Sequence, residues 1–260
     1  KVEKNGRIHG SVNTNGAVTG RATHAFPNVA QVPAVGVPYG KECRELFTVS
    51  AGNKLVGVDV SGLELRCLAH YMARYDGGTY AETVVNGDVH SANQKAADLP
   101  SRSQAKTFIY GFLYGAGVEK IGSIIGKGAK EGAVLKKRFL KSLPALDTLI
   151  KRVQEASKKG HLIGLDGRRL RVRAEYAALN TLLQSAGALI CKQWIREFDK
   201  ALHETNLHEH CSLVSWVHDE IQLEVKEGME KDVGELAVKS IGRAGDFFRI
   251  RCELTGEYKV

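Results

Sequence analysis

Two aspartates, each at the end of an apolar stretch, are the residues of this sequence best suited to chemistry. Asp59 follows the apolar run 55–58, and Asp219 lies between two apolar runs in the stretch 212–225. Two carboxylates about 4 Å apart repel each other by roughly 4 kcal/mol at an effective dielectric constant near 20. Hard divalent cations, which prefer oxygen ligands, offset such a repulsion. Two of these ions can act on the attacking and leaving oxygens of a phosphoryl transfer.

The surrounding pattern predicts how each aspartate is presented. The run 55–58 predicts a buried strand, the following Ser-Gly pair predicts a turn, and 63–75 has the apolar spacing of a helix. The stretch 212–225 predicts a hairpin whose acidic tip is His218-Asp219-Glu220. The spacing permits the two strand ends to meet but does not show it. A simple turn or cap role for Asp59 remains the alternative.

A second pattern predicts a site for a charged ligand on a helix. The segment 101–114 predicts a helix with a serine cap at its start and a glycine after its end. Arg102, Lys106, Tyr110 and Tyr114 recur every four residues and therefore share one face. Two cations followed by two aromatic rings suit a triphosphate and a stacked base. An ordinary amphipathic helix with solvated cations is the alternative.

The charge of the chain is concentrated in its middle. The 260 residues carry a formal net charge of +8. Of these residues 43% are hydrophobic, which is enough to form a sizeable hydrophobic core in one or two domains. Residues 101–173 contain 17 Lys and Arg against 5 Asp and Glu, while the rest of the chain is net acidic. A basic block of this kind favours a phosphate-rich partner. A solvated basic helical face explains the charge equally well.

The cysteines and the hydropathy pattern indicate an intracellular protein. The five cysteines are scattered and form no CxxC pair, so we expect free thiols in a reducing compartment. No run of eighteen apolar residues is present, and the sequence starts with polar residues, so we expect neither a membrane span nor a signal peptide.

The remaining segments give a coarse map of secondary structure. We expect short strands at 7–10, 16–21 and 249–254, a hairpin turn at 165–168, and helices at 40–47, 80–85, 87–98, 130–143, 145–158, 177–202 and 233–248.

Three weaker candidates lie in the second half of the chain. Arg168 and Arg169, with two further arginines after them, are placed to bind a phosphate backbone. Asn180 and Gln184, at i and i+4 on the helix 177–202, could contact base edges, although such positions are more often simply polar. The histidines and the cysteine in 203–211 have an irregular spacing for zinc, and a solvated linker is the alternative.

Taken together, three motifs resemble those of family A DNA polymerases. The segment 59–66, DVSGLELR, resembles the first palm motif, DYSQIELR. Arg102-x3-Lys106-x3-Tyr110-Gly111 resembles the fingers motif, and the tripeptide 218–220 is similar to the second palm motif, HDE. The sequence that flanks the motifs is similar to that of replicative polymerases of short-tailed bacteriophages, and the similarity extends from about Gly6 to nearly Val260.

The resemblance implies an α+β fold of the right-hand type. An antiparallel palm sheet would be formed by residues 1–75 and 176–260, and helical fingers by the inserted residues 76–175. It implies template-directed DNA synthesis from dNTPs on a primer-template, in the host-cell cytoplasm if a phage encodes the chain. A single-subunit RNA polymerase shares this architecture, but Glu64 and Glu220 argue against it.

The resemblance also implies a role for each matching residue. Asp59, Asp219 and the backbone carbonyl of Val60 would hold two Mg²⁺ ions, which Mn²⁺ could replace. His90, Arg102 and Lys106 would bind the triphosphate, Lys106 also as general acid, and Tyr110 would stack near the incoming sugar and base. Glu64 would lie beside Tyr110 and block a ribose 2′-hydroxyl. Tyr114 remains a nucleotide-binding candidate from its place on the same helical face. Arg21, Asn180 and Gln184 would contact the minor-groove side of the new pair and the template. His218 and Glu220 would lie near the primer end, and Glu220 would also be a catalytic residue as a further metal ligand.

Two departures from the family pattern qualify these expectations. Val60 and Gly62 replace a tyrosine and a glutamine of the usual first motif, both outside the metal ligands. The family's thumb and exonuclease would precede Lys1, and its tryptophan-containing tail would follow Tyr258. We therefore expect a piece of a longer polymerase or one subunit of a split one. Such a chain would hold DNA weakly, because phosphate contacts supply most of the affinity, and it could bind primer-template or dNTP without turnover.

Overall fold

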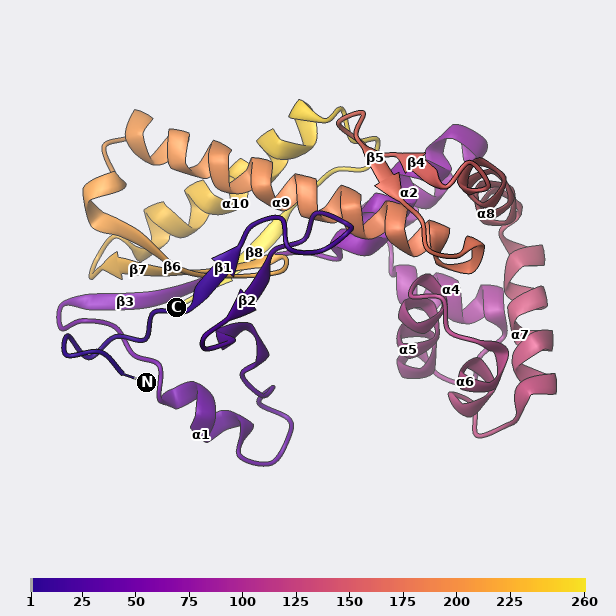
Figure 1. The fold of residues 1–260 in the computed structure, drawn as a ribbon, viewed down its shortest axis with the longest axis horizontal. Coiled ribbons are helices and arrows are strands. Elements are labelled where there is room, and N and C mark those ends of the chain that lie inside the picture. Colours follow the sequence, from indigo (N-terminus) through magenta and orange to yellow (C-terminus); the bar gives the residue numbers. More distant parts are fainter. Residues whose placement is uncertain (1) are drawn as a thin grey trace. The chain divides into compact units, whose positions relative to one another are not determined.

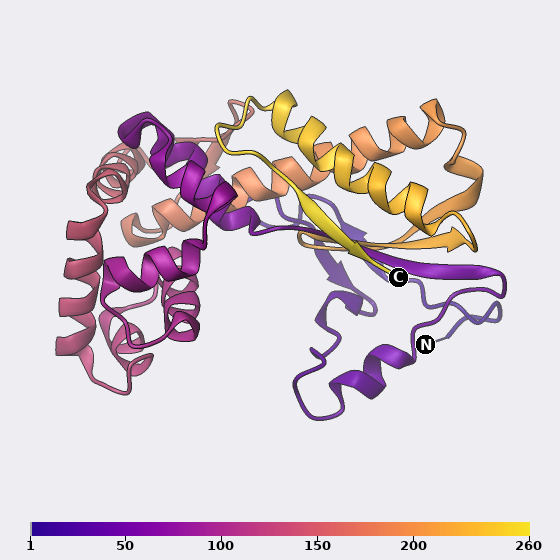
Figure 2. The same cartoon turned by 180° about the vertical axis from the view of Figure 1, so that it is seen from behind.

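The computed structural model describes residues 2–260, which form two compact units. The first unit contains Lys1–Leu63, Gly187–Arg249 and Leu254–Val260, and the second contains Glu64–Ala186 and Ile250–Glu253. Figures 1 and 2 show the elements of both units from opposite sides. The structure mixes helices with antiparallel sheets, which confirms the predicted α+β class. The division into palm and fingers at residues 75 and 176 stays a prediction.

The first unit is built on a four-stranded antiparallel sheet with strand order β6-β7-β3-β8 (Figure 1). The strands are β3 (Asn53–Val60), β6 (Cys211–Val217), β7 (Glu220–Lys226) and β8 (Gly256–Lys259). Val56, Val58 and Val60 alternate along β3 and are at most 1% exposed, so one face of the sheet is buried. The predicted strand before Asp59 and the predicted hairpin around Asp219 are both confirmed.

Helix α10 (Glu230–Phe247) covers the buried face of this sheet (Figure 2). Its apolar residues Val233, Ala237, Ile241 and Ala244 recur at helical spacing and are fully buried. The second half of α9 (Ala178–Glu204) joins this layer, because the Trp194 indole donates a 2.8 Å hydrogen bond to the Ala237 carbonyl. The predicted helices 177–202 and 233–248 are therefore confirmed within a few residues.

Smaller elements complete the first unit. They are the hairpin of β1 (Ser11–Asn13) and β2 (Thr23–Ala25), the 3-10 turns η1 (Val29–Gln31) and η3 (His208–His210), and the predicted helix α1 (Gly40–Glu45). The predicted strands 7–10 and 16–21 are wrong, because the strands lie further along the chain. Residues 16–21 instead form the reversal between them, where Gly20 adopts φ +81° and its N–H bonds the Ala17 carbonyl at 2.8 Å.

The second unit is mainly helical. Its elements are α2 (Leu63–Asp76), α3 (Thr79–Asn86), α4 (Val89–Ala97), α5 (Arg102–Leu113), α6 (Val118–Ser123), α7 (Ala129–Ser142), α8 (Pro144–Ser157), the hairpin of β4 (His161–Ile163) and β5 (Arg169–Arg171), η2 (Glu175–Ala177) and the first half of α9. Phe108, Phe112 and Phe139 form its aromatic core, with ring centroids 5.0 to 5.9 Å apart. All of these α-helices except α6 were predicted, and the 3-10 turn η2 was not.

The predicted strand 249–254 is wrong. This segment has no strand pairing, and side chains of α2 bind its backbone instead: His70 Nδ1 accepts the Arg251 N–H at 3.0 Å, and Arg66 donates to the Glu253 carbonyl. The last strand is β8, which begins at Gly256, opposite Val60 of β3. Cys252 and Leu254 are nevertheless buried, and Leu254 lies against Gly245 of α10, so the alternating apolar residues of this segment are explained by packing on a helix rather than by strand pairing.

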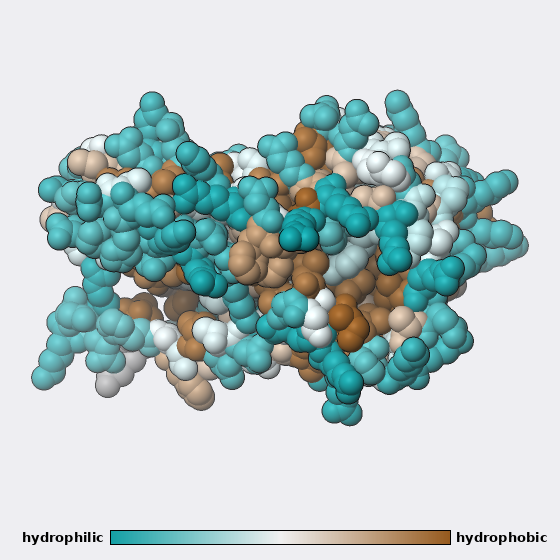
Figure 3. Space-filling model, turned by 90° about the horizontal axis from the view of Figure 1, so that it is seen from above, coloured by the Kyte–Doolittle hydropathy of each residue, from teal (hydrophilic) through white to brown (hydrophobic). Residues whose placement is uncertain are grey.

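Two compositional predictions can be compared with the structure. All five cysteines are free thiols, as expected. Within residues 2–260, no helix has the length and hydropathy that a membrane crossing requires. The face shown in Figure 3 is hydrophilic over most of its area, with hydrophobic residues gathered between the polar ones.

Candidate active-site residues

Strand pairing brings the backbones of Asp59 and Asp219 together in the first unit. In the antiparallel register of β3 and β7, Asp59 lies opposite Glu220, and the Val60 N–H donates a 3.1 Å hydrogen bond to the carbonyl of Asp219. The two aspartates therefore stand at the same end of two neighbouring strands. The sequence permitted this arrangement without showing it.

A row of three acidic residues crosses the sheet at this point. Asp59 is paired with Glu220 of β7 on one side and with Glu257 of β8 on the other. Residues paired across antiparallel strands present their side chains on the same face. That face carries an open depression of about 490 Å³, which includes all three residues and Gly57. The row concentrates negative charge where the sequence predicted a metal site, and Glu257 was not among the expected residues.

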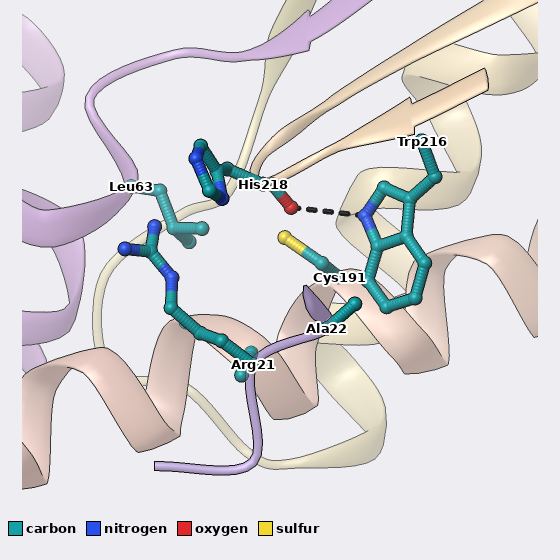
Figure 4. A pocket seen from close by; sticks show the side chains of 8 residues that line it. Arg21, Ala22, Leu63, Cys191, Trp216 and His218 are labelled. Atoms are coloured by element: carbon teal, nitrogen blue, oxygen red, sulfur yellow. Dashed lines mark hydrogen bonds between the residues drawn. The ribbon is translucent and has the colours of Figure 1, made fainter. Parts of the chain in front are cut away.

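The turn that carries Asp219 is held by a neighbouring indole. His218 adopts φ +58°, a left-handed conformation that is uncommon for residues other than glycine. The Trp216 indole donates a 2.9 Å hydrogen bond to the His218 carbonyl. Figure 4 shows this bond beside a small pocket that Arg21 and Cys191 also line. Arg21 and His218, both expected at DNA, thus lie around one pocket near the acidic turn.

The second unit presents the predicted cationic and aromatic stripe on α5. The Ser101 hydroxyl caps this helix by accepting the Gln104 N–H at 3.2 Å, and Gly115 follows it with φ +77°. Arg102, Lys106 and Tyr114 are exposed and Tyr110 is half-buried. The opposite face of α5 is part of the core, with Phe108 and Ile109 fully buried. The stripe therefore lies on the face of α5 that points away from the core, and the core holds the helix in place.

Arg102 forms an ion pair that the sequence did not predict. Its Nε and Nη2 donate to the two carboxylate oxygens of Asp88, at 2.7 and 3.1 Å. Hydrogen bonds from Arg102 and Ser91 hold the pKa of Asp88 far below its usual range.

The ring centroid of His90 is 6.2 Å from that of Tyr110. Partial burial and the charges of Arg102 and Lys106 lower the pKa of His90.

Glu64 is bound by the last residue of the stripe. The Tyr114 hydroxyl donates a 2.9 Å hydrogen bond to Glu64 Oε1. Glu64 was expected beside Tyr110, which lies one turn before Tyr114 on the same face of α5. In the structure, the hydrogen bond from Tyr114 orients the Glu64 carboxylate.

The remaining predicted residues occupy separate places. Asn180 and Gln184 are half-buried on the first half of α9, one turn apart as expected. Arg169 is exposed on β5, whereas the Nε of Arg168 pairs with Asp166 Oδ2 at 2.6 Å across the hairpin turn. Glu220 accepts a hydrogen bond from the Gln222 side chain.

The weak zinc hypothesis gains no support. The rings of His203 and His208 stack with centroids 4.3 Å apart. Throughout residues 2–260, however, no three His, Cys, Asp or Glu side chains cluster in a way that could hold a metal ion. This finding includes the acidic row of Asp59, Glu220 and Glu257, so the Asp59–Asp219 metal site stays a prediction.

Comparisons with known proteins agree with these features. The family model described as DNA polymerase family A matches residues 1–260. DNA-directed DNA polymerases of Enterobacteria phage T3 and Escherichia phage T7 are each 49% identical over all of this chain, which covers 41% of either relative. That of Escherichia phage Phieco32 is 36% identical over 82% of this chain and 40% of the relative. The chain thus spans about two-fifths of the length of these relatives.

A solved structure shares the fold. The polymerase domain of Pol1 from M. smegmatis, in complex with DNA primer-template and dNTP, is 26% identical with a TM-score of 0.86. The match covers 99% of this chain and 48% of the solved chain. On the family match over its whole length and the phage relatives, the chain belongs to DNA polymerase family A.

Proposed function

We propose that this chain carries the nucleotidyl-transfer chemistry of DNA synthesis, joining a dNTP to the 3′-hydroxyl of a primer as a template directs. The pairing of β3 with β7 is the observation that carries the proposal, because it sets Asp59 beside the turn of Asp219. Family membership and the relatives' names support the reaction type.

The donor set at this strand end suits hard divalent cations. Carboxylate oxygens are the ligands that Mg²⁺ and Mn²⁺ prefer, and a row of like charges is relieved by bound cations. Asp59, Asp219 and the Val60 carbonyl would hold two such ions. When bound, the ions would lower the pKa of the primer hydroxyl and neutralise the charge of the triphosphate.

The residues of the second unit would handle the nucleotide. Arg102 and His90 bind the triphosphate oxygens, and Lys106 binds them and gives a proton to the leaving pyrophosphate. Tyr110 stacks against the incoming sugar and base. The carboxylate of Glu64, oriented by its hydrogen bond from Tyr114, excludes a ribose 2′-hydroxyl.

Polar residues of both units would contact the DNA. Arg21, Asn180 and Gln184 approach the minor-groove side of the new pair and the template, and His218 with Glu220 contacts the primer end. Arg168 and Arg169 bind the backbone, although the pairing of Arg168 with Asp166 leaves it less available. The charge of these arginines makes the binding sensitive to salt.

A binding-only function is the second candidate. The chain covers only 41% of the T3 and T7 relatives, so the parts that hold duplex DNA firmly could lie in the remaining length of such a protein. The isolated 260-residue chain would then bind primer-template or dNTP without turnover.

Primer extension by the 260-residue chain separates these functions. Asp219→Asn removes one carboxylate charge, and Asp246→Asn is the matched control, at an exposed site in the last turn of α10 in the same unit. We expect the parent and the control to extend the primer equally and Asp219→Asn to be slower by about a thousandfold, since metal-ion catalysis contributes several kcal/mol. Equal rates for Asp219→Asn would contradict the proposal. Nucleotide binding without any extension would support the binding-only function.

A further inference from the structure

One carboxylate in the second unit connects two residues expected at the triphosphate. Asp88 is the N-cap of α4, and its Oδ1 accepts the backbone N–H groups of His90 at 3.1 Å and Ser91 at 3.3 Å. The same carboxylate accepts from the Ser91 hydroxyl at 2.7 Å. It also accepts both donors of the Arg102 fork, at 2.7 and 3.1 Å. Asp88 therefore fixes the start of the helix that carries His90 and the first side chain of α5.

Folding stability does not account for this ion pair. The side chains of Asp88 and Arg102 are 43% and 56% exposed. Exposed ion pairs contribute little to stability, because water screens the charges and two long side chains lose freedom. Capping of α4 needs only an oxygen at residue 88, which asparagine or serine would also supply. The bidentate hold on Arg102 is the part that requires a carboxylate.

The geometry leaves Arg102 able to bind a second anion. A guanidinium has five N–H donors, and Asp88 uses one on Nε and one on Nη2. Both donors of Nη1 and the second donor of Nη2 are not used by this pair. An arginine held in this way has already lost much of the rotational freedom that anion binding would otherwise cost.

We propose that Asp88 is a positioning residue for the triphosphate, holding Arg102 by one edge of its guanidinium so that the other edge is ready for phosphate oxygens. This inference rests on the proposed nucleotide-binding function of Arg102 and His90. It adds an acidic residue, which would itself repel phosphate, to the residues that determine nucleotide affinity. If Asp88 only competed with phosphate for the Arg102 guanidinium, the effect would be the opposite: removing its carboxylate would strengthen nucleotide binding.

Isothermal titration calorimetry with dATP and with inorganic tripolyphosphate tests this proposal on the 260-residue chain. Asp88→Asn keeps the cap oxygen but loses the charge and one acceptor of the fork. We expect it to weaken binding of both ligands by roughly 3- to 10-fold, the cost of ordering one flexible side chain. The melting temperature should stay unchanged. Asp98→Asn is the matched control, because Asp98 also pairs with an arginine, Arg138 at 2.7 Å.

A double-mutant cycle shows whether the effect passes through Arg102. We expect Arg102→Ala to weaken binding, and Asp88→Asn to cause no further loss in the Arg102→Ala background. If Arg102→Ala weakens binding while Asp88→Asn leaves it unchanged or tightens it, the positioning role is wrong and the nucleotide-binding role of Arg102 stands. If Arg102→Ala also binds like the parent, the role of Arg102 in the proposed function fails and the positioning role fails with it.

Discussion

Replacing Glu224 with glutamine should destabilise the strand pair that carries Asp59 and Asp219. Glu224 lies on β7 with its side chain only 6% exposed. Its carboxylate accepts the Ser50 N–H at 2.8 Å and the Asn53 amide at 2.9 Å, from the segment entering β3. Arg7 donates to it at 2.7 Å. All three partners are donors, so a glutamine amide would turn its own N–H groups toward at least one of them.

The expected loss follows from the charge of this carboxylate. Hydrogen bonds from Asn53 and Ser50, with a further one from Arg7, lower the pKa of Glu224 from 4.5 to about 2. At 1.36 kcal/mol for each pH unit, this corresponds to about 3 kcal/mol of stability. Because the folded pKa lies below the unfolded one, that stabilisation is fully present above pH 4.5 and is lost as the pH falls toward 2.

Urea unfolding followed by tryptophan fluorescence measures this effect, since Trp194 and Trp216 both lie in the first unit. We expect Glu224→Gln to lower the free energy of unfolding by about 3 kcal/mol at pH 7 and by much less at pH 3. Glu227→Gln is the control, because Glu227 is 62% exposed and its pair with Lys54 at 3.1 Å is worth little. A loss for Glu224→Gln that is equal at both pH values would refute the reasoning.

Four further substitutions test the assigned residues. Glu64→Ala should raise ribonucleotide incorporation by at least about tenfold, and Tyr114→Phe, which removes one hydrogen bond to Glu64, should raise it by less. Single-nucleotide extension with dNTP and with rNTP measures both effects. Unchanged sugar discrimination would argue against the exclusion of a ribose 2′-hydroxyl by Glu64. Trp216→Phe loses the hydrogen bond to the His218 carbonyl, so it should lower the free energy of unfolding in urea by about 1 kcal/mol. It should also weaken primer-template binding measured by fluorescence anisotropy. Parent-like values in both measurements would show that the indole does not hold the turn. The resemblance to family A polymerases implies that a tyrosine rather than a phenylalanine at residue 110 permits dideoxynucleotides. Tyr110→Phe should therefore reduce their incorporation in competition assays, and rejection of dideoxynucleotides by the parent would show that this property does not extend to this chain.

The elements around the site were predictable from local patterns. The apolar run 55–58 before Asp59 identified β3, and two apolar runs around Asp219 identified the β6–β7 hairpin. The four-residue period from Arg102 identified the exposed stripe of α5, because its opposite face is apolar. Each of these signals arises within a single helix or strand, because the backbone geometry of the element fixes how often a side chain returns to the same face.

Features that depend on contacts between distant segments were missed. The run 249–254 is partly apolar and therefore predicts a strand, although α2 binds its backbone. Glu257 joined the acidic row only through the pairing of β8 with β3. Asp88 could have been noticed as a helix cap two residues before His90, but its pairing with Arg102 requires the packing of α4 on α5. Sequence periodicity carries no information about such partners.

Asp59 and Asp219 are proposed to act as one divalent-cation site. Titration of Mn²⁺ into the 260-residue chain, followed by electron paramagnetic resonance, tests it most directly with Asp59→Asn, Asp219→Asn and the double variant. We expect each single variant to lose at least the roughly 10- to 100-fold in affinity that changes beside a metal ligand cost, and the double variant to lose little more. Parent-like affinity in either single variant, or losses that simply add in the double variant, would contradict a shared site.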